Sequence, residues 1–242
     1  MDVGSARTRA WTAGRGPVLD VPTVAVDGPG RPVRRGAIVD EAACAGLLRR
    51  LLAHRLRGPA RPLVVLTTPV LDSVAYRTAA RSAVRVLGPR AVLTVPGARA
   101  IAVAAGAALS RPLLVVDVGA QLTEVVLLDE GAVADARRVA LGTADLGGGA
   151  TEDDVVDAVA TMVAATLRQD RDSLVPAALS RGVLLAGGGA LRAGIVRRLE
   201  ARLPAPLVVV PGPHTAAVRG AARLLGAVGL HPSARGPGPT GW

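Results

Sequence analysis

Residues 117–123, which read D-V-G-A-Q-L-T, decide the fold because nearly the same pattern stands at the start of the chain. Residues 2–8 read D-V-G-S-A-R-T, so both copies have an acid first, a glycine third and a threonine seventh. A repeat of this kind indicates a duplicated structural unit. A β-rich stretch follows the first copy and a predicted hairpin follows the second, and in each the glycine permits a tight turn. We therefore expect two similar lobes whose hairpins face a common cleft.

The rest of the chain alternates between strand and helix patterns, in a similar order after each copy. Apolar runs bounded by Gly or Pro predict strands, and amphipathic stretches predict helices. The predicted strands are residues 63–68, 91–95, 113–117, 124–128, 132–140, 182–186 and 206–210. The predicted helices are residues 41–57, 71–87, 98–109, 190–202 and 214–228, and one that Thr151 caps, with Glu152, Asp153 and Asp154 in its first turn. This alternation predicts an α/β protein.

Composition excludes several kinds of site. All 29 basic residues are arginines, which excludes a P-loop lysine, a Schiff-base enzyme and a lysine general base. One cysteine and three scattered histidines do not make a zinc site or a disulfide framework. With two Trp, one Tyr and no Phe, the chain lacks the stacking platforms of single-strand nucleic-acid binders.

The net charge of +10 is spread along the chain. Arginines occur singly or in pairs, as on solvated helix faces, so nucleic acid is not the expected partner. Attraction to anionic lipid would explain the positive charge as well as nucleic-acid binding would. The longest charge-free apolar stretch, residues 100–109, is far shorter than the about 18 residues of a membrane-spanning helix. No signal-peptide pattern opens the chain, so we expect a cytoplasmic protein, with peripheral contact at the inner face of the membrane.

The two copies of the repeat supply groups that suit a phosphate and its metal ion. Gly4 and Gly119 let backbone N–H groups approach an anion closely, and Asp2 and Asp117 can hold a hydrated Mg²⁺ through their carboxylates. The alternative is that both aspartates only make the local hydrogen bonds of a turn.

Hydroxyl and glycine groups complete this predicted phosphate site. Ser5 and Thr123 can add hydroxyl donors. Gly187, Gly188 and Gly189 lie between an apolar strand and a helix start, where bare backbone can lie against a nucleotide. The alternative is that these three glycines only permit tight strand-to-helix packing.

The ordered trio D-V-G-S, D-V-G-A-Q-L-T-E and L-A-G-G-G-A-L resembles the phosphate-1, phosphate-2 and adenosine motifs of the actin, Hsp70 and sugar-kinase ATPase superfamily. The chain is most similar to the MreB-like rod-shape-determining bacterial actins. The resemblance implies an actin-like ATPase fold of two RNase H-like lobes with ATP and Mg²⁺ between them. It also implies nucleotide-dependent filament assembly under the membrane, with full-length bacterial actin, other morphogenetic proteins or further copies of the chain as partners.

The resemblance also predicts how the chain is divided. Residues 1–111 are expected to form the first actin-like lobe, to which a helix at 213–228 returns, and residues 112–212 the second. Residues 229–242, rich in Pro and Gly, are expected to be a disordered tail. Little room remains for the outer subdomain of either lobe, so both are expected to be reduced or missing. Met1 alone precedes Asp2, which predicts few ladder hydrogen bonds for the first strand.

The chain departs from the family at the catalytic position. Relatives carry Glu-Glu-Pro there, and its carboxylate orients the attacking water, whereas residues 96–98 read P-G-A. We therefore assign no catalytic residue. In phosphate-2, residues 120–122 (A-Q-L) replace paired glycines and a threonine, and in phosphate-1, Arg7 replaces a small amide, where it either contacts phosphate or is solvated.

These observations predict a shortened MreB-like protein of cell shape and cytoskeleton that binds ATP weakly, hydrolyses it slowly or not at all, and acts through protein partners. One alternative is a small-molecule kinase, for which Asp72 and Asp145 are the candidate bases. The other is a chaperone ATPase of the Hsp70 type. Glu124 is interpreted as a strand-edge charge or a retained site residue, and His214 as a neighbour of a helix cap.

Overall fold

The computed structural model describes residues 1–12, 16–26, 28, 30–56, 61–72 and 74–230. Every predicted strand and helix is present, with differences at the ends. The predicted tail lies outside the described residues from 231 onward, and its first two residues, 229 and 230, belong to the last helix instead.

Five strands of the first half of the chain form one group of three and one group of two. The strands are β1 (Asp2–Val3), β2 (Arg7–Thr12), β3 (Gly16–Pro22), β6 (Leu63–Thr68) and β7 (Ala91–Pro96). Strands β1, β2 and β3 are antiparallel in that order, and β6 pairs with β7 in parallel. Met1 joins the two groups, because its amino group donates to Val65 O (2.7 Å) and its carbonyl accepts from Thr67 N–H (2.9 Å). The ladder beside β1 is therefore short, as the sequence predicted, but backbone hydrogen bonds place β1 next to β6.

The second half repeats this arrangement in one continuous sheet. Its strands are β8 (Leu113–Val118), β9 (Thr123–Asp129), β10 (Ala132–Val139), β11 (Val183–Ala186) and β12 (Leu207–Val209). Their order is β10-β9-β8-β11-β12, in which β8 is antiparallel to β9 and parallel to β11. The first half has the same order, β3-β2-β1-β6-β7, so the predicted duplication extends to the topology.

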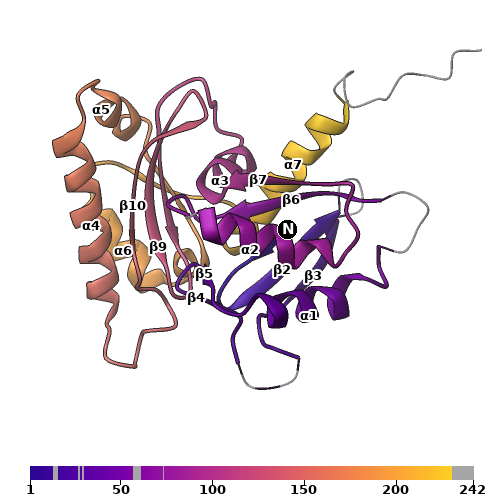
Figure 1. Ribbon diagram of the computed structural model, residues 1–242. Coiled ribbons are helices and arrows are strands. Elements are labelled where there is room, and N and C mark those ends of the chain that lie inside the picture. Colours follow the sequence, from indigo (N-terminus) through magenta and orange to yellow (C-terminus); the bar gives the residue numbers. More distant parts are fainter. Residues whose placement is uncertain (13–15, 27, 29, 57–60, 73, 231–242) are drawn as a thin grey trace, which may run out of the picture.

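Helices fill the space on both faces of each sheet (Figure 1). They are α1 (Glu41–Leu52), α2 (Val74–Arg85), α3 (Gly97–Ala105), α4 (Glu152–Gln169), α5 (Leu174–Leu179), α6 (Ala193–Arg202) and α7 (Ala216–Leu230), with 3-10 turns η1 (Gly188–Leu191) and η2 (Pro213–Thr215). Helices α1 and α2 share a core with β1, β2 and β6, and α4, α5 and α6 cover one face of the second sheet. Helices α3 and α7 lie between the sheets and contribute to the cores of both.

Small elements stand where the resemblance places the outer subdomains. Between β3 and α1, the described residues hold a hairpin of β4 (Val33–Arg34) and β5 (Ala37–Ile38), whose turn residues Arg35 and Gly36 have φ of 46° and 74°. Between β10 and β11 the chain forms α4 and α5. Both insertions are as reduced as the sequence predicted.

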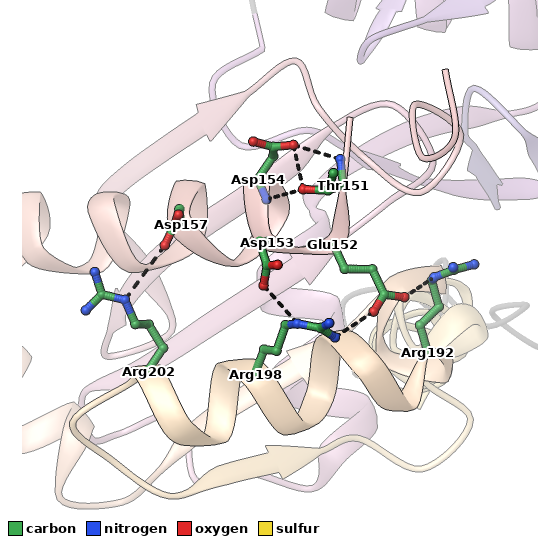
Figure 2. Close-up of polar contacts among 8 residues, drawn as sticks. All are labelled: Thr151, Glu152, Asp153, Asp154, Asp157, Arg192, Arg198 and Arg202. Atoms are coloured by element: carbon green, nitrogen blue, oxygen red, sulfur yellow. Dashed lines mark hydrogen bonds and ion pairs between the residues drawn. The ribbon is translucent and has the colours of Figure 1, made fainter. Parts of the chain in front are cut away.

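Helix α4 begins as predicted and is fixed to α6 by charged groups (Figure 2). Thr151 Oγ1 accepts from Asp154 N–H (3.2 Å), and the Asp154 carboxylate accepts from Thr151 N–H (2.7 Å), which is a capping box. Glu152 pairs with Arg192 (2.9 Å) and Arg198 (3.0 Å). Arg192 follows the turn η1, so these ion pairs attach the end of the glycine turn to α4.

Candidate functional site

A cavity of about 520 Å³ lies where the two halves of the chain face each other. Most of the predicted site residues line it, namely Asp2, Gly4, Ser5, Asp117, Gly119, Gly187 and Gly188. They come from the β1–β2 turn, the β8–β9 turn and the turn after β11. The duplicated turns therefore face one cavity, as the repeat predicted.

The two acid-glycine turns have the same internal geometry. Gly4 N–H donates to Arg7 O (3.0 Å), and Gly119 N–H donates to Leu122 O (2.9 Å). A Cβ on Gly119 would lie 2.8 Å from Leu122 O, which is too close for any other residue. The N–H groups of the two glycines themselves therefore close the turns.

Other backbone amides in the turns are available to an anion. Among the described residues, the N–H groups of Ser5, Ala6, Ala120 and Gln121 have no hydrogen-bond acceptor within the protein. Successive free N–H groups in a turn form a concave anion site. The turns therefore offer phosphate contacts next to the glycines.

Each turn presents a charged pair in the same register. Asp2 on β1 is opposite Arg9 on β2, and Asp117 on β8 is opposite Glu124 on β9. In both cases the partner is seven residues after the aspartate, and all four side chains line the cavity. The motif itself pointed to the aspartates and left Glu124 open and Arg9 unassigned, although the common spacing was a signal for both partners.

The two aspartates have different surroundings. Asp2 Oδ1 accepts from Thr67 Oγ1 (2.9 Å), and Asp2 Oδ2 lies 3.7 Å from an Arg9 guanidinium nitrogen. Burial, and to a smaller extent the charge of Asp2, raise the pKa of Asp117 to about 7, while Arg9 opposes the shift. Within the described part of the chain, neither aspartate makes the local turn hydrogen bonds that were the alternative interpretation.

Glu124 faces the cavity and contacts the other half of the chain. Its Oε1 accepts from Val70 N–H (2.8 Å), just beyond the end of β6. Burial raises the pKa of Glu124 to about 7, the Val70 hydrogen bond opposes the shift, and Asp117 adds to it. Glu124 is therefore a site residue rather than only a strand-edge charge.

The glycine turn after β11 is held closely against β8. Gly187 has φ of 85°, and a Cβ there would lie 2.3 Å from Val118 O and 2.4 Å from Asp117 Oδ1. Gly188 has open space instead, since Thr143 Oγ1 at 3.9 Å is the nearest atom to its Cβ position. On the neighbouring η2 turn, His214 lines the cavity and its Nδ1 is buried without a partner among the described residues.

Two predicted site residues lie outside the cavity lining. Thr123 is fully buried, and its Oγ1 donates to Leu141 O (2.8 Å). Gly189 is also buried, and it packs so closely against β8 that a Cβ there would meet Val118 Cγ1 at 2.3 Å. Thr123 therefore stabilises the start of β9, and Gly189 serves the packing role that was its alternative interpretation.

Several other residues settle open alternatives. Arg7 forms an ion pair with Asp20 on β3 (2.5 Å) at the cavity wall, so it is not merely solvated, and its contact with phosphate stays a prediction. The candidate kinase bases do not line the cavity: Asp72 pairs with Arg77 (2.7 Å), and Asp145 pairs with Arg35 (3.1 Å).

The donor set suits Mg²⁺ only together with a bound phosphate. In the part of the chain that the structure describes, no three His, Cys, Asp or Glu side chains gather into a metal site. Mg²⁺ is commonly held by one or two carboxylates plus substrate phosphates and water, a role that Asp2 and Asp117 can supply. Arg9, however, already places a positive charge beside them.

Comparison with known proteins identifies the family. The family model described as MreB/Mbl protein matches residues 29–149, half of the chain. The chain belongs to the MreB/Mbl family. The match covers the second acid-glycine turn and the P-G-A stretch at residues 96–98, and it does not extend to the first acid-glycine turn or to the glycine turn at 187–189. A search of curated proteins by sequence found no match.

Solved structures show that this MreB/Mbl chain has the actin-like ATPase fold. MreB5 of Spiroplasma citri bound to ADP matches with a TM-score of 0.82 at 15% identity, over 94% of this chain and 95% of that one. The MamK double helical filament matches with a TM-score of 0.73 at 14% identity, over 93% and 97%. The ethanolamine utilization protein EutJ from Carboxydothermus hydrogenoformans matches with a TM-score of 0.65 at 19% identity, over 91% and 87%. Within the described residues, no helix has the length and apolar character needed to span a bilayer.

Proposed function

We propose that this protein is a cytoskeletal, cell-shape member of its family that binds ATP in the cavity between its lobes and hydrolyses it slowly or not at all. The observation that carries the proposal is the convergence of both acid-glycine turns and the 187–188 turn on one cavity. A triphosphate there would meet free amides from both lobes, and the bare backbone of Gly188 leaves room for the nucleoside. The similar MreB5 of Spiroplasma citri is bound to ADP, which supports a nucleotide as the ligand.

Slow hydrolysis follows from the end of β7. Pro96 ends this strand and Gly97, which lines the cavity, begins α3, so the position carries no carboxylate to orient water. A positioned general base contributes about a hundredfold to ten-thousandfold in rate. We expect ATP turnover at least about a hundredfold below that of relatives that retain the carboxylate.

Because we expect little ATP turnover, we propose that the protein acts through binding to protein partners. We propose that the protein joins or regulates a full-length bacterial actin in the cytoplasm, at the inner face of the membrane, in cell-wall morphogenesis. The similar MamK forms a double helical filament, which supports assembly with actin-like chains, including further copies of this one. Sedimentation with ATP, alone and with a full-length bacterial actin, tests this step: co-pelleting supports it, and a protein that stays monomeric in both mixtures contradicts it.

The nucleotide proposal is tested by calorimetric titration with ATP and Mg²⁺ and with a variant that fills the cavity. Gly188→Leu is suitable because its Cβ position is free of close contacts, so the variant is expected to fold. Gly46→Leu on α1 is the matched control, since its Cβ position also has no atom within 4 Å and it does not line the cavity. We expect binding by the wild type and by Gly46→Leu, and none by Gly188→Leu. Equal binding by all three proteins would place the nucleotide elsewhere.

A further inference from the structure

The duplicated turns differ in the residue opposite the aspartate, and this difference puts a fixed cation into the cavity. Asp2 faces Arg9 in the first turn, whereas Asp117 faces Glu124 at the equivalent register position of the second. These four equivalent positions therefore bring three carboxylates and one guanidinium into the cavity.

Arg9 is held in place by acidic groups. One terminal guanidinium nitrogen of Arg9 lies 3.7 Å from Asp2 Oδ2, and the Nε atom of Arg9 lies 3.2 Å from Asp20 Oδ1. Its side chain is 15% exposed, and its buried Nε makes no well-formed hydrogen bond with the described residues. The guanidinium is thus fixed by charge on one side and retains unused donors.

The charge of Arg9 also reaches the second lobe. It lowers the pKa of Asp117, against the effects of burial and of Asp2. Arg9 therefore acts on both Asp2 and Asp117, the two carboxylates that the sequence predicts as ligands of Mg²⁺. A resident cation beside these two carboxylates weakens their attraction for a divalent ion, because like charges repel.

We propose that the Arg9 guanidinium takes over the charge-neutralising part of Mg²⁺ in this cavity and contacts the bound polyphosphate directly, so that nucleotide binding does not require a divalent ion. This inference rests on the proposed nucleotide function. The planar guanidinium presents paired N–H donors that match two phosphate oxygens, which a metal-free contact needs. Thr67 and the residues with free amides in the β1–β2 turn, Ser5 and Ala6, line the same cavity as Arg9.

The first test is calorimetric titration of wild-type protein with ATP, in excess Mg²⁺ and in excess EDTA. We expect the dissociation constant to change by no more than about threefold, because Arg9 supplies the neutralising charge in both solutions. Arg9→Leu should bind about tenfold to a hundredfold more weakly than wild type in EDTA, the range for one charge-assisted hydrogen bond, and should recover with Mg²⁺. Arg81→Leu, which removes an exposed arginine from α2, is the charge-matched control and should behave as wild type.

The second test needs no nucleotide. Electron paramagnetic resonance of Mn²⁺ added to the ligand-free proteins should show weak binding by wild type and tighter binding by Arg9→Leu, because Asp2 and Asp117 are then unopposed. Arg9→Lys keeps the charge without the paired donors and should retain the weak Mn²⁺ binding. This variant provides the comparison with wild type if Arg9→Leu fails to fold.

The outcomes separate the two proposals. ATP binding by wild type that is strong in Mg²⁺ and lost in EDTA overturns the role of Arg9 and leaves the nucleotide proposal standing. Equal EDTA binding by wild type and Arg9→Leu also overturns it, since Arg9 would then serve only its ion pairs. No ATP binding under either condition overturns both proposals.

Discussion

Replacing Glu124 by glutamine should stabilise the ligand-free protein, and more so at high pH. The carboxyl group of Glu124 keeps its proton up to about pH 7 in the folded protein, against an ordinary pKa of 4.5. Between these values the folded state binds more protons than the unfolded state, so stability falls as pH rises through this window. At about 1.4 kcal/mol per pKa unit, the acid group costs roughly 3 kcal/mol at pH 8, where it is ionised in the folded protein, and roughly 1 kcal/mol at pH 5, where it must take up a proton on folding.

The glutamine side chain would retain a carbonyl oxygen for Val70 N–H and carry no charge, so Glu124→Gln should remove this cost. Thermal unfolding followed by circular dichroism measures it: Tm should rise by about 6–12 °C at pH 8 and by a few degrees at pH 5. Glu200→Gln, at an exposed position on α6, is the control and should leave Tm unchanged at both values. A Glu124→Gln protein that is less stable than wild type at pH 8, or equally shifted at both pH values, would refute the reasoning.

Three further changes test other parts of the structure. Gly220→Val should destabilise the protein by about 3 kcal/mol or more in urea unfolding, because a Cβ at Gly220 would lie 1.7 Å from Ala100 O where α7 crosses α3. Gly226→Val on the same helix is the control and should cost far less, because its Cβ position has no atom within 4 Å. Arg35→Ala should speed amide hydrogen exchange in the β4–β5 hairpin, because Arg35 connects this hairpin to Ala140 O and to Asp145. The free energy of unfolding of the whole protein should fall by at most about 1 kcal/mol, and unchanged exchange in the hairpin would contradict the connection. Glu152→Gln should lower the free energy of unfolding by about 1 kcal/mol or less in low salt and by almost nothing in high salt, since the arginine partners of Glu152 are half exposed. A loss of stability that persists in high salt would show that packing, rather than these ion pairs, holds α4 in place.

The elements could be predicted where local signals were strong. Pro62 and Pro69 bound the strand at 63–68, and β6 occupies that range. The helix expected at 98–109 was too long, because the apolar residues continue to Leu109 although α3 ends at Ala105. Gly106, with φ of 70°, caps that helix in the left-handed region, a signal that the apolar pattern concealed.

The cleft could be predicted from the repeat, but the role of each side chain could not. Thr8 and Thr123 occupy the same position in the two copies, and both are fully buried rather than exposed to a ligand. Their burial depends on which side of a strand faces the core, and this follows from strand pairing rather than from the motif. Arg9 and Glu124 were hard to assign for the same reason, since their common spacing of seven residues from Asp2 and Asp117 gains its meaning from the strand register that places them opposite these aspartates.

The position of α7 sets an order in which the molecule can be assembled during its synthesis. Ala221 of this helix shares a core with Val65, Val95 and Ala100, which the ribosome makes long before it. One face of the first sheet is thus covered by α3 but not yet by α7 until α7 has left the ribosome exit tunnel. The second sheet, whose strands and outer helices are all complete by then, can form before it. The lobe that is translated first is therefore the one whose core is completed last.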